Sequence, residues 1–172
     1  MVKHAPAAGR LASDRDIIGV SAKCCNIFIY PFKSRPLIEQ SEICGCIRRF
    51  LRYLGMKEEY GMALFFSGRG MLLGECALQK GSYVFSNEFC DIILETGSRL
   101  GASSFIIAHN HVLSRPIPSV ADTMTTGRIE EFFSKRELIF ADHFIVAGSD
   151  YTTMKTKGYW TKRYDGKTLE IE

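Results

Sequence analysis

Residues 103–133, SSFIIAHNHVLSRPIPSVADTMTTGRIEEFF, decide the expected fold of the chain. The apolar run at 103–108 predicts a short buried strand. Two prolines stiffen the loop at 109–118, and Ser119 then begins a helix that is expected to reach Phe133. We expect one side of this helix to be formed by Ala121, Met124, Thr125, Ile129, Phe132 and Phe133. A strand followed by a helix is a typical unit of an α/β domain.

Further segments with the character of strands and helices lie on both sides of this unit. The expected strands are 26–30, 60–66, 71–78, 143–147 and 151–154, and the expected helices are 37–54 and 86–100. The first of these helices has its apolar residues at helical spacing, with Arg48, Arg49 and Arg52 on its solvated side. Strands and helices mix without strict alternation. This order predicts an α/β fold with a mixed, partly antiparallel sheet flanked by helices.

Length and composition favour a single globular domain. The chain has 172 residues, of which 46% are hydrophobic and 24% charged, as in ordinary globular proteins. We expect a disordered tail at 1–16, one domain at 17–160 and a basic tail at 161–172. No apolar run approaches the ~20 residues that a membrane span needs. The net charge of +3 is too small to argue for nucleic acid by itself.

Cysteine usage indicates a reducing compartment. The six cysteines are Cys24, Cys25, Cys44, Cys46, Cys76 and Cys90. A chain of this size does not need disulfides, and its first 16 residues lack the apolar stretch of a signal peptide. We therefore expect buried thiols and a cytoplasmic location. A zinc site made of cysteines is disfavoured, because the spacing C-x2-C is absent.

The chemistry of the chain is expected at His109-Asn110-His111, at the end of an apolar strand. Side chains two apart on a strand point the same way, so both imidazoles can reach one point. Asp122, one turn into the next helix, can direct a carboxylate back to that point. Two His and one Asp leave a fourth tetrahedral position open, which is typical of catalytic rather than structural zinc.

Simpler interpretations exist for each part of this group. Ser119 and Asp122 are spaced as a helix capping box, and His-x-His can be a hydrogen-bonded surface pair. The full string H-x-H-x7-S-x2-D is much more specific than either part, because four positions must coincide. The complete pattern therefore favours a metal site.

The string resembles the JAMM signature of MPN-type zinc metallopeptidases, and the Asn between the histidines is similar to the RadC branch of that superfamily. Segments 59–66, 80–82, 106–111, 142–146 and 151–158 resemble other RadC motifs. The resemblance covers roughly residues 35 to 160. It implies a JAB/MPN (cytidine-deaminase-like) fold and a zinc-dependent hydrolase that cleaves peptide or isopeptide bonds.

The resemblance also implies roles for single residues. His109, His111 and Asp122 become the Zn²⁺ ligands, Glu59 the general base and Ser119 the group that steadies the oxyanion. The residues alone do not choose between Glu58 and Glu59, although Glu59 would share its strand face with small residues. The implied partner is a peptide or protein substrate, including a ubiquitin-like modifier. Binding to a membrane is not expected.

Two functions compete with hydrolysis. The first is a DNA-associated module for repair or recombination, since RadC chains commonly carry an N-terminal region associated with DNA, which residues 1–35 do not resemble. The second is a nuclease, suggested by the letters H-N-H, but nuclease HNH motifs are spread over a ββα element. Basic and aromatic residues from Tyr151 onward can bind single-stranded nucleic acid, but a solvated tail is the preferred interpretation. His143 is expected to be a buried, hydrogen-bonded core residue.

One departure from the RadC pattern concerns the substrate. The loop after the second histidine reads Val112-Leu113-Ser114-Arg115, where RadC chains usually have Pro-Ser-Gly-Asp. Arg115 is therefore expected to add positive charge near the cleft. The change bears on substrate preference and leaves the ligands intact.

Overall fold

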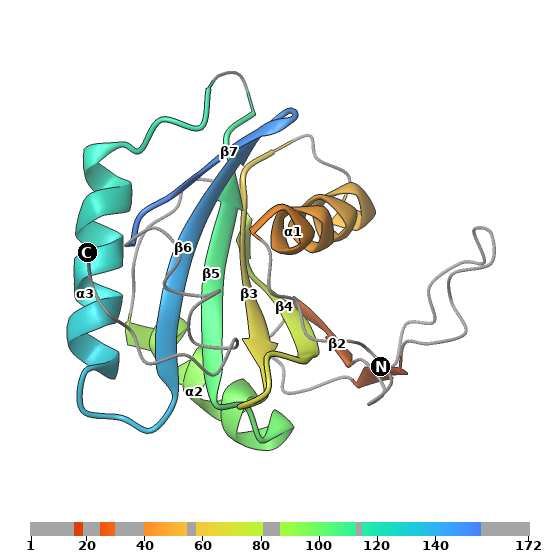
Figure 1. The fold of residues 1–172 in the computed structure, drawn as a ribbon, viewed down its shortest axis with the longest axis vertical. Coiled ribbons are helices and arrows are strands. Elements are labelled where there is room, and N and C mark those ends of the chain that lie inside the picture. Colours follow the sequence, from red (N-terminus) through yellow and green to blue (C-terminus); the bar gives the residue numbers. More distant parts are fainter. Residues whose placement is uncertain are drawn as a thin grey trace.

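One seven-stranded mixed sheet organises the chain (Figure 1). The computed structural model describes residues 16–18, 25–29, 40–54, 58–80, 87–112 and 115–155. The strands are β1 (Asp16–Ile18), β2 (Cys25–Ile29), β3 (Tyr60–Phe66), β4 (Leu72–Lys80), β5 (Ser104–Asn110), β6 (Ile139–Ala147) and β7 (Asp150–Thr153). Their order is β1-β2-β4-β3-β5-β6-β7, and only the pairing of β5 with β6 is parallel.

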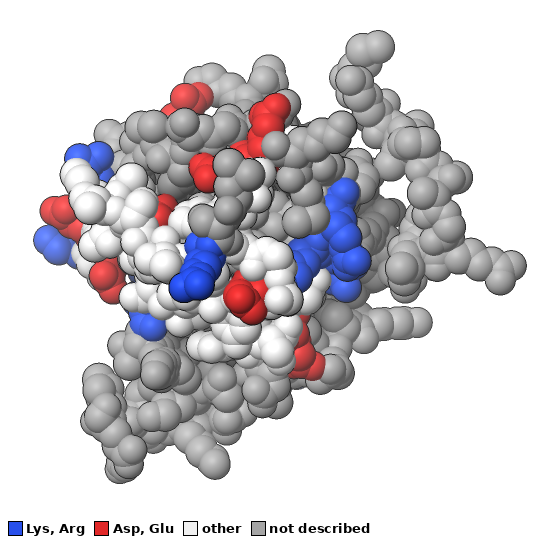
Figure 2. Space-filling model, turned by 90° about the horizontal axis from the view of Figure 1, so that it is seen from above, with Lys and Arg blue, Asp and Glu red and all other residues white. Residues whose placement is uncertain are grey.

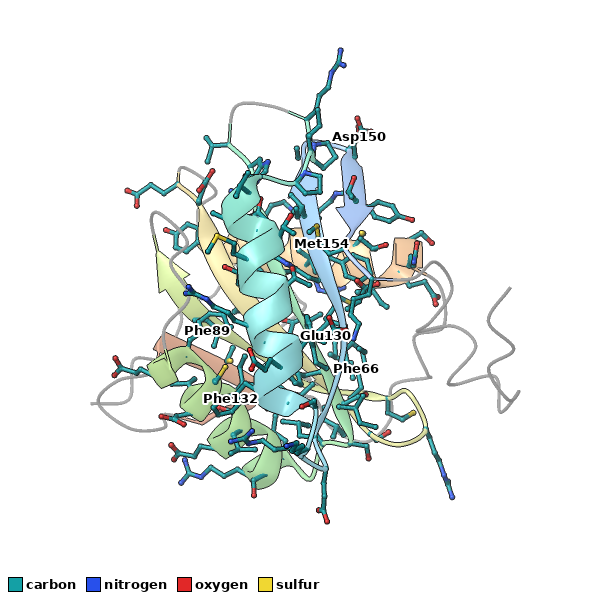
Figure 3. The ribbon with its side chains drawn as sticks, turned by 90° about the vertical axis from the view of Figure 1, so that its left-hand side faces the viewer. Phe66, Phe89, Glu130, Phe132, Asp150 and Met154 are labelled. Carbon is teal, nitrogen blue, oxygen red and sulfur yellow. The ribbon has the colours of Figure 1, made fainter. Side chains whose placement is uncertain are left out.

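Three helices cover the two faces of this sheet. They are α1 (Gln40–Leu54), α2 (Asn87–Leu100) and α3 (Val120–Phe133). Figure 1 shows α1 on one side of the sheet and α3 on the other, and Figure 3 shows α3 lying along its face. The α/β class and the mixed, partly antiparallel sheet predicted from the sequence are confirmed.

Strands β3 and β5 are buried on both faces, because their side chains alternate between two separate cores. Met62, Leu64, Ile106 and Ala108 pack on the α1 side. Their odd-numbered neighbours pack on the side of α2 and α3: Ala63, Phe65, Phe105 and Ile107. Continuous apolar runs in these strands follow from this double coverage.

The buried side of α1 is the one predicted, but Arg48 and Arg49, expected on the solvated side, are half-buried, while Arg52 is exposed. Ile43, Ile47, Phe50 and Leu51 are fully buried. Arg48 donates hydrogen bonds to the carbonyl oxygens of Gly148 (3.1 Å), Ser149 and Asp150 (3.3 Å). This guanidinium therefore joins α1 to the turn between β6 and β7.

The prediction for the buried side of α3 was right at Thr125, Ile129 and Phe133 and wrong at Ala121 and Met124. Ala121 is exposed and Met124 is 53% exposed. The buried residues are Asp122, Thr125, Thr126, Ile129 and Phe133. An apolar pattern could not reveal this side, because its N-terminal half is polar and faces other polar groups at the end of β5.

Several boundaries differ from those expected, and some expectations lie outside the described residues. β5 extends through His109 and Asn110, and β6 begins at Ile139, four residues before the expected start. Asp16 belongs to β1, while residues 1–15 and 156–172, which include most of both expected tails, are outside the described part of the chain. Cys44, Cys46, Cys76 and Cys90 are buried free thiols, as predicted. Within the described residues, no helix combines the length and apolar character needed to cross a membrane.

A buried carboxyl group on β6 joins this strand to the end of β7. The Oδ1 atom of Asp142 accepts hydrogen bonds from the backbone amides of His143 (2.7 Å) and Lys155 (3.0 Å). Asp142 is 1% exposed, and its Oδ2 atom has no hydrogen-bond partner among the described residues. Burial raises the pKa of this carboxyl from 3.8 to about 6 and outweighs the opposing effect of the hydrogen bonds and of Lys155.

This raised pKa predicts a pH-dependent stability. Between pH 4 and 6 the folded protein holds a proton on Asp142 that the unfolded chain releases, so stability falls as the pH rises through this window. The loss above pH 6 should be on the order of 3 kcal/mol. Asp142→Asn stays neutral, so its free energy of unfolding relative to wild type should increase from pH 4 to 7. Urea titrations across this range measure the difference, and a constant difference would contradict the assignment.

Candidate metal centre

Three side chains from two elements converge at the C-terminal end of β5. The Nε2 atom of His109 lies 3.1 Å from Nε2 of His111 and 3.1 Å from Oδ1 of Asp122. The Nε2 atom of His111 lies 3.7 Å from Oδ2 of Asp122. Among the described residues, these three form the group able to hold a metal ion. The convergence predicted from the sequence is therefore present.

The spacing of these atoms suits a tetrahedral ion. Two ligands at 2.0–2.1 Å from zinc lie about 3.3 Å apart at a tetrahedral angle. The two separations of 3.1 Å, from His109 Nε2 to His111 Nε2 and to Asp122 Oδ1, are close to that value. His109 and Asp122 have side chains only 2% and 4% exposed, whereas His111 is 16% exposed. The group is thus open to solvent on the His111 side.

Asp122 serves the helix and the centre with different oxygens. Its Oδ2 atom accepts hydrogen bonds from the backbone amide and the hydroxyl of Ser119, both at 2.7 Å. Ser119 Oγ in turn accepts from the Asp122 amide, which completes a capping box at the start of α3. Oδ1 remains directed at His109. The capping and metal-ligand interpretations are therefore compatible.

The electrostatic setting keeps Asp122 ionised. Burial alone would raise the pKa of its carboxyl, but the contact with His109 and the hydrogen bonds from Ser119 outweigh burial and hold the pKa well below its usual range. A carboxylate that is charged at neutral pH is ready to act as a ligand.

Each histidine uses its second ring nitrogen to contact a further group. Nδ1 of His111 lies 3.3 Å from the carbonyl oxygen of Arg115. Nδ1 of His109 lies 2.9 Å from Nε2 of His143, whose own Nδ1 lies 2.8 Å from the hydroxyl of Thr126. Such outer contacts orient the imidazoles of metal sites.

His143 is buried and hydrogen-bonded, as predicted, yet its ring contacts a candidate ligand. Burial lowers the pKa of this imidazole to about 3, so the ring is neutral. The link from His143 and Thr126 to the centre was not predicted from the sequence. The sequence offered one signal for this link, the place of His143 at the start of the expected strand 143–147.

The other expected site residues lie near this end of the sheet. Glu59 is half-buried and directly precedes β3, while Glu58 is exposed. Ser119 is the exposed N-cap of α3. Arg115 is exposed, and Leu113 and Ser114 lie outside the described residues. Their catalytic roles stay predictions.

Comparison with known proteins adds independent information. The family model for a RadC-like JAB domain matches residues 39–159, which include all three candidate ligands. A UPF0758 protein of Bordetella avium is 28% identical over 146 residues, covering 80% of this chain and 65% of its own. A UPF0758 protein of Desulforamulus reducens is 28% identical over 129 residues, covering 74% and 56%. One from Neisseria meningitidis is 31% identical over 111 residues, covering 63% and 49%. The chain thus spans from half to two thirds of these relatives, whose names state no activity.

The geometry predicts metal binding in solution. Protein purified without chelator should contain about one zinc per chain, and His109→Ala should lose it, because two ligands hold the ion less well than three. Elemental analysis of both proteins gives the result. Asp150→Asn, which changes an exposed carboxylate in the turn between β6 and β7, is the control and should keep its zinc. Equal zinc in wild type and His109→Ala would remove this centre from consideration.

Proposed function

Because the chain belongs to the family of RadC-like JAB domains and brings His109, His111 and Asp122 together, we propose that it is a zinc-dependent hydrolase of peptide or isopeptide bonds. The substrate would be a peptide or a protein, including one joined to a ubiquitin-like modifier. The observation that carries the proposal is the donor set: two imidazoles and one carboxylate that leave one side open. Structural zinc sites are closed by four protein ligands, whereas catalytic sites have three and an open position.

Strand alternation supports Glu59 as the general base. Gly61 is opposite His109 in the antiparallel pairing of β3 with β5, so Glu59 comes to the level of His111. Tyr60 packs on the α1 side of the sheet, which directs its neighbour Glu59 to the other side. That side carries α3 and the candidate ligands. Glu58, two residues before Tyr60, shares the α1 side by the same rule.

The side chain of Asn110 supports the same assignment. Its Oδ1 atom accepts a hydrogen bond from the Tyr60 amide at 2.9 Å, and its Nδ2 atom donates to the Glu58 carbonyl at 3.0 Å. The two peptide groups that flank Glu59 are therefore held by one buried amide. Because these groups set the backbone torsions of Glu59, they restrict the direction of its side chain.

In the proposed hydrolysis, the metal, the Glu59 carboxylate and the three ligands have separate roles. Zinc, when bound, supplies the Lewis acidity that lowers the pKa of a water to about 7. The Glu59 carboxylate accepts a proton from the attacking water as the new C–O bond forms. It then gives that proton to the leaving amine as the C–N bond breaks. His109, His111 and Asp122 hold the ion, and the buried walls around His109 exclude bulk solvent from its inner side.

Ser119 would stabilise the oxyanion only after its hydrogen bond is redirected. A hydroxyl has one proton, and in this structure Ser119 Oγ directs it to Oδ2 of Asp122 at 2.7 Å. The proposed role requires this proton to turn toward the substrate oxygen. Since the Ser119 backbone amide also donates to Oδ2, the carboxylate keeps a partner during that change.

The surface at this edge of the sheet does not favour the DNA-associated alternative. Figure 2 views the molecule from the end at which β5 terminates, and on the described part of that face acidic and basic residues are interspersed. A protein that tracks a phosphate backbone would present a continuous basic stripe. Lys155, the first lysine of the basic C-terminal segment, instead pairs with Glu130 at 2.9 Å.

Substitutions at Glu59 and at Asp122 should have different effects on zinc content and turnover. Glu59→Gln cannot accept a proton, so turnover of a peptide or isopeptide substrate should fall on the order of 100- to 10,000-fold while zinc is retained. Asp122→Asn should lose zinc and activity together, because a neutral amide is the poorer ligand. Zinc content and cleavage rate are measured on both proteins.

Glu58→Gln is the matched control, since it makes the same change one residue away and should leave the rate within about threefold of wild type. Near wild-type activity in Glu59→Gln would exclude this base. Loss of zinc in Glu59→Gln would make Glu59 a ligand or a structural support.

A further inference from the structure

A closed ring of polar contacts joins β5, α3 and β6 behind the candidate metal centre. It runs from the Asp122 carbonyl to the Thr126 hydroxyl (2.7 Å), on to His143 Nδ1 (2.8 Å), and from His143 Nε2 to His109 Nδ1 (2.9 Å). It closes where His109 Nε2 faces Asp122 Oδ1 at 3.1 Å. All four residues are at most 6% exposed, so water does not compete for these bonds.

We propose that Thr126 and His143 are positioning residues that set the tautomer of His109, so that its Nε2 atom presents a lone pair to the ion. This inference rests on the proposed metal centre and assigns a role to two residues outside the ligand set. The Thr126 hydroxyl fixes the donors and acceptors in this ring, because it is the hydroxyl among the four residues.

The hydroxyl of Thr126 has a single proton, which it donates to the Asp122 carbonyl, since a carbonyl oxygen can only accept. Thr126 Oγ must then accept from His143 Nδ1, which lies 2.8 Å away. The protonated nitrogen of the neutral His143 ring is therefore Nδ1. Its Nε2 atom is left as an acceptor.

The acceptor on His143 determines which nitrogen of His109 is protonated. An acceptor at His143 Nε2 requires a donor at His109 Nδ1, 2.9 Å away. His109 is thus protonated at Nδ1, and its Nε2 atom points a lone pair at the centre. Lone pairs of His111 Nε2 and Asp122 Oδ1 face this atom at 3.1 Å. Three acceptors at such short range need a cation between them.

A different tautomer would oppose metal binding. If His109 were protonated at Nε2 alone, that proton would form a hydrogen bond with Asp122 Oδ1 and block both ligand atoms at once. The Thr126 hydroxyl disfavours this state, because it keeps the His143 proton on Nδ1 and two lone pairs, on His109 Nδ1 and His143 Nε2, would then face each other at 2.9 Å. The ring therefore removes a metal-free arrangement that competes with the ion.

Long-range proton–nitrogen correlation spectra of ¹⁵N-labelled, metal-free protein test the tautomers directly. We expect His143 to carry its proton on Nδ1, and His109 to carry one on Nδ1 whatever the state of Nε2. A merely structural role for the buried pair would not require either result. Protonation of His143 at Nε2, or of His109 at Nε2 alone, overturns the proposal.

Substitutions at Thr126 test the consequence for zinc. Thr126→Val has the same shape but no hydroxyl, and its zinc dissociation constant should rise about 10- to 100-fold, as for other outer partners of metal ligands. Thr126→Ser restores the hydroxyl and should bind zinc as wild type does. Competition with a chromophoric chelator measures the constants. Thr125→Val is the matched control, because it removes a buried hydroxyl one residue away, outside the ring, and should leave zinc affinity unchanged.

The outcomes separate this proposal from the proposed function. Unchanged zinc affinity in Thr126→Val, or an equal loss in Thr125→Val, contradicts the positioning role while the hydrolase proposal stands. A wild-type protein that binds no zinc would overturn the proposed function. In that case the spectra of the metal-free protein would still decide whether Thr126 and His143 set the tautomer of His109.

Discussion

The carboxylate of Asp122 is the group on which the centre depends, because its two oxygens join a helix to a strand. Oδ2 accepts two hydrogen bonds from Ser119 and thereby ends the loop and begins α3. Oδ1 faces His109 on β5. The donors at the helix N-terminus also favour its negative charge. The interaction that starts the helix therefore also orients the third ligand.

Side chains alternate in direction along β5, so consecutive residues contact different elements. His109 faces α3 together with His111, whereas Asn110 reaches the backbone of residues 58 and 60. Both faces of the sheet are covered, so each of these polar side chains must find a partner or lose stability. The partners come from β3, α3 and β6, which meet only in the folded protein. The buried polar cluster is tolerated because its members bond to one another and to the backbone.

Much of the architecture follows from local patterns. Apolar runs located β3, β5 and part of β6, and helical spacing located α1 and its buried side, because burial of apolar area is the signal that these patterns carry. The first turns of α3 and the start of β6 escaped the same reasoning. Asp122, Thr126 and Asp142 are buried polar residues, which a sequence pattern marks as surface. These residues are buried because groups from other elements pack around them, which the sequence of their own segment does not indicate.

The sequence by itself determined which residues converge, because a strand period of two and one helical turn are local geometry. His109, His111 and Asp122 lie within 14 positions of one another, so short-range rules were sufficient. Only the tertiary structure decided which groups from other strands contact this centre. His143 reaches His109 through the parallel pairing of β5 with β6, and Asn110 reaches the backbone around Glu59 across the antiparallel pairing with β3. Contacts between distant strands depend on register and on how α3 packs back onto the sheet, and neither is encoded in any single segment.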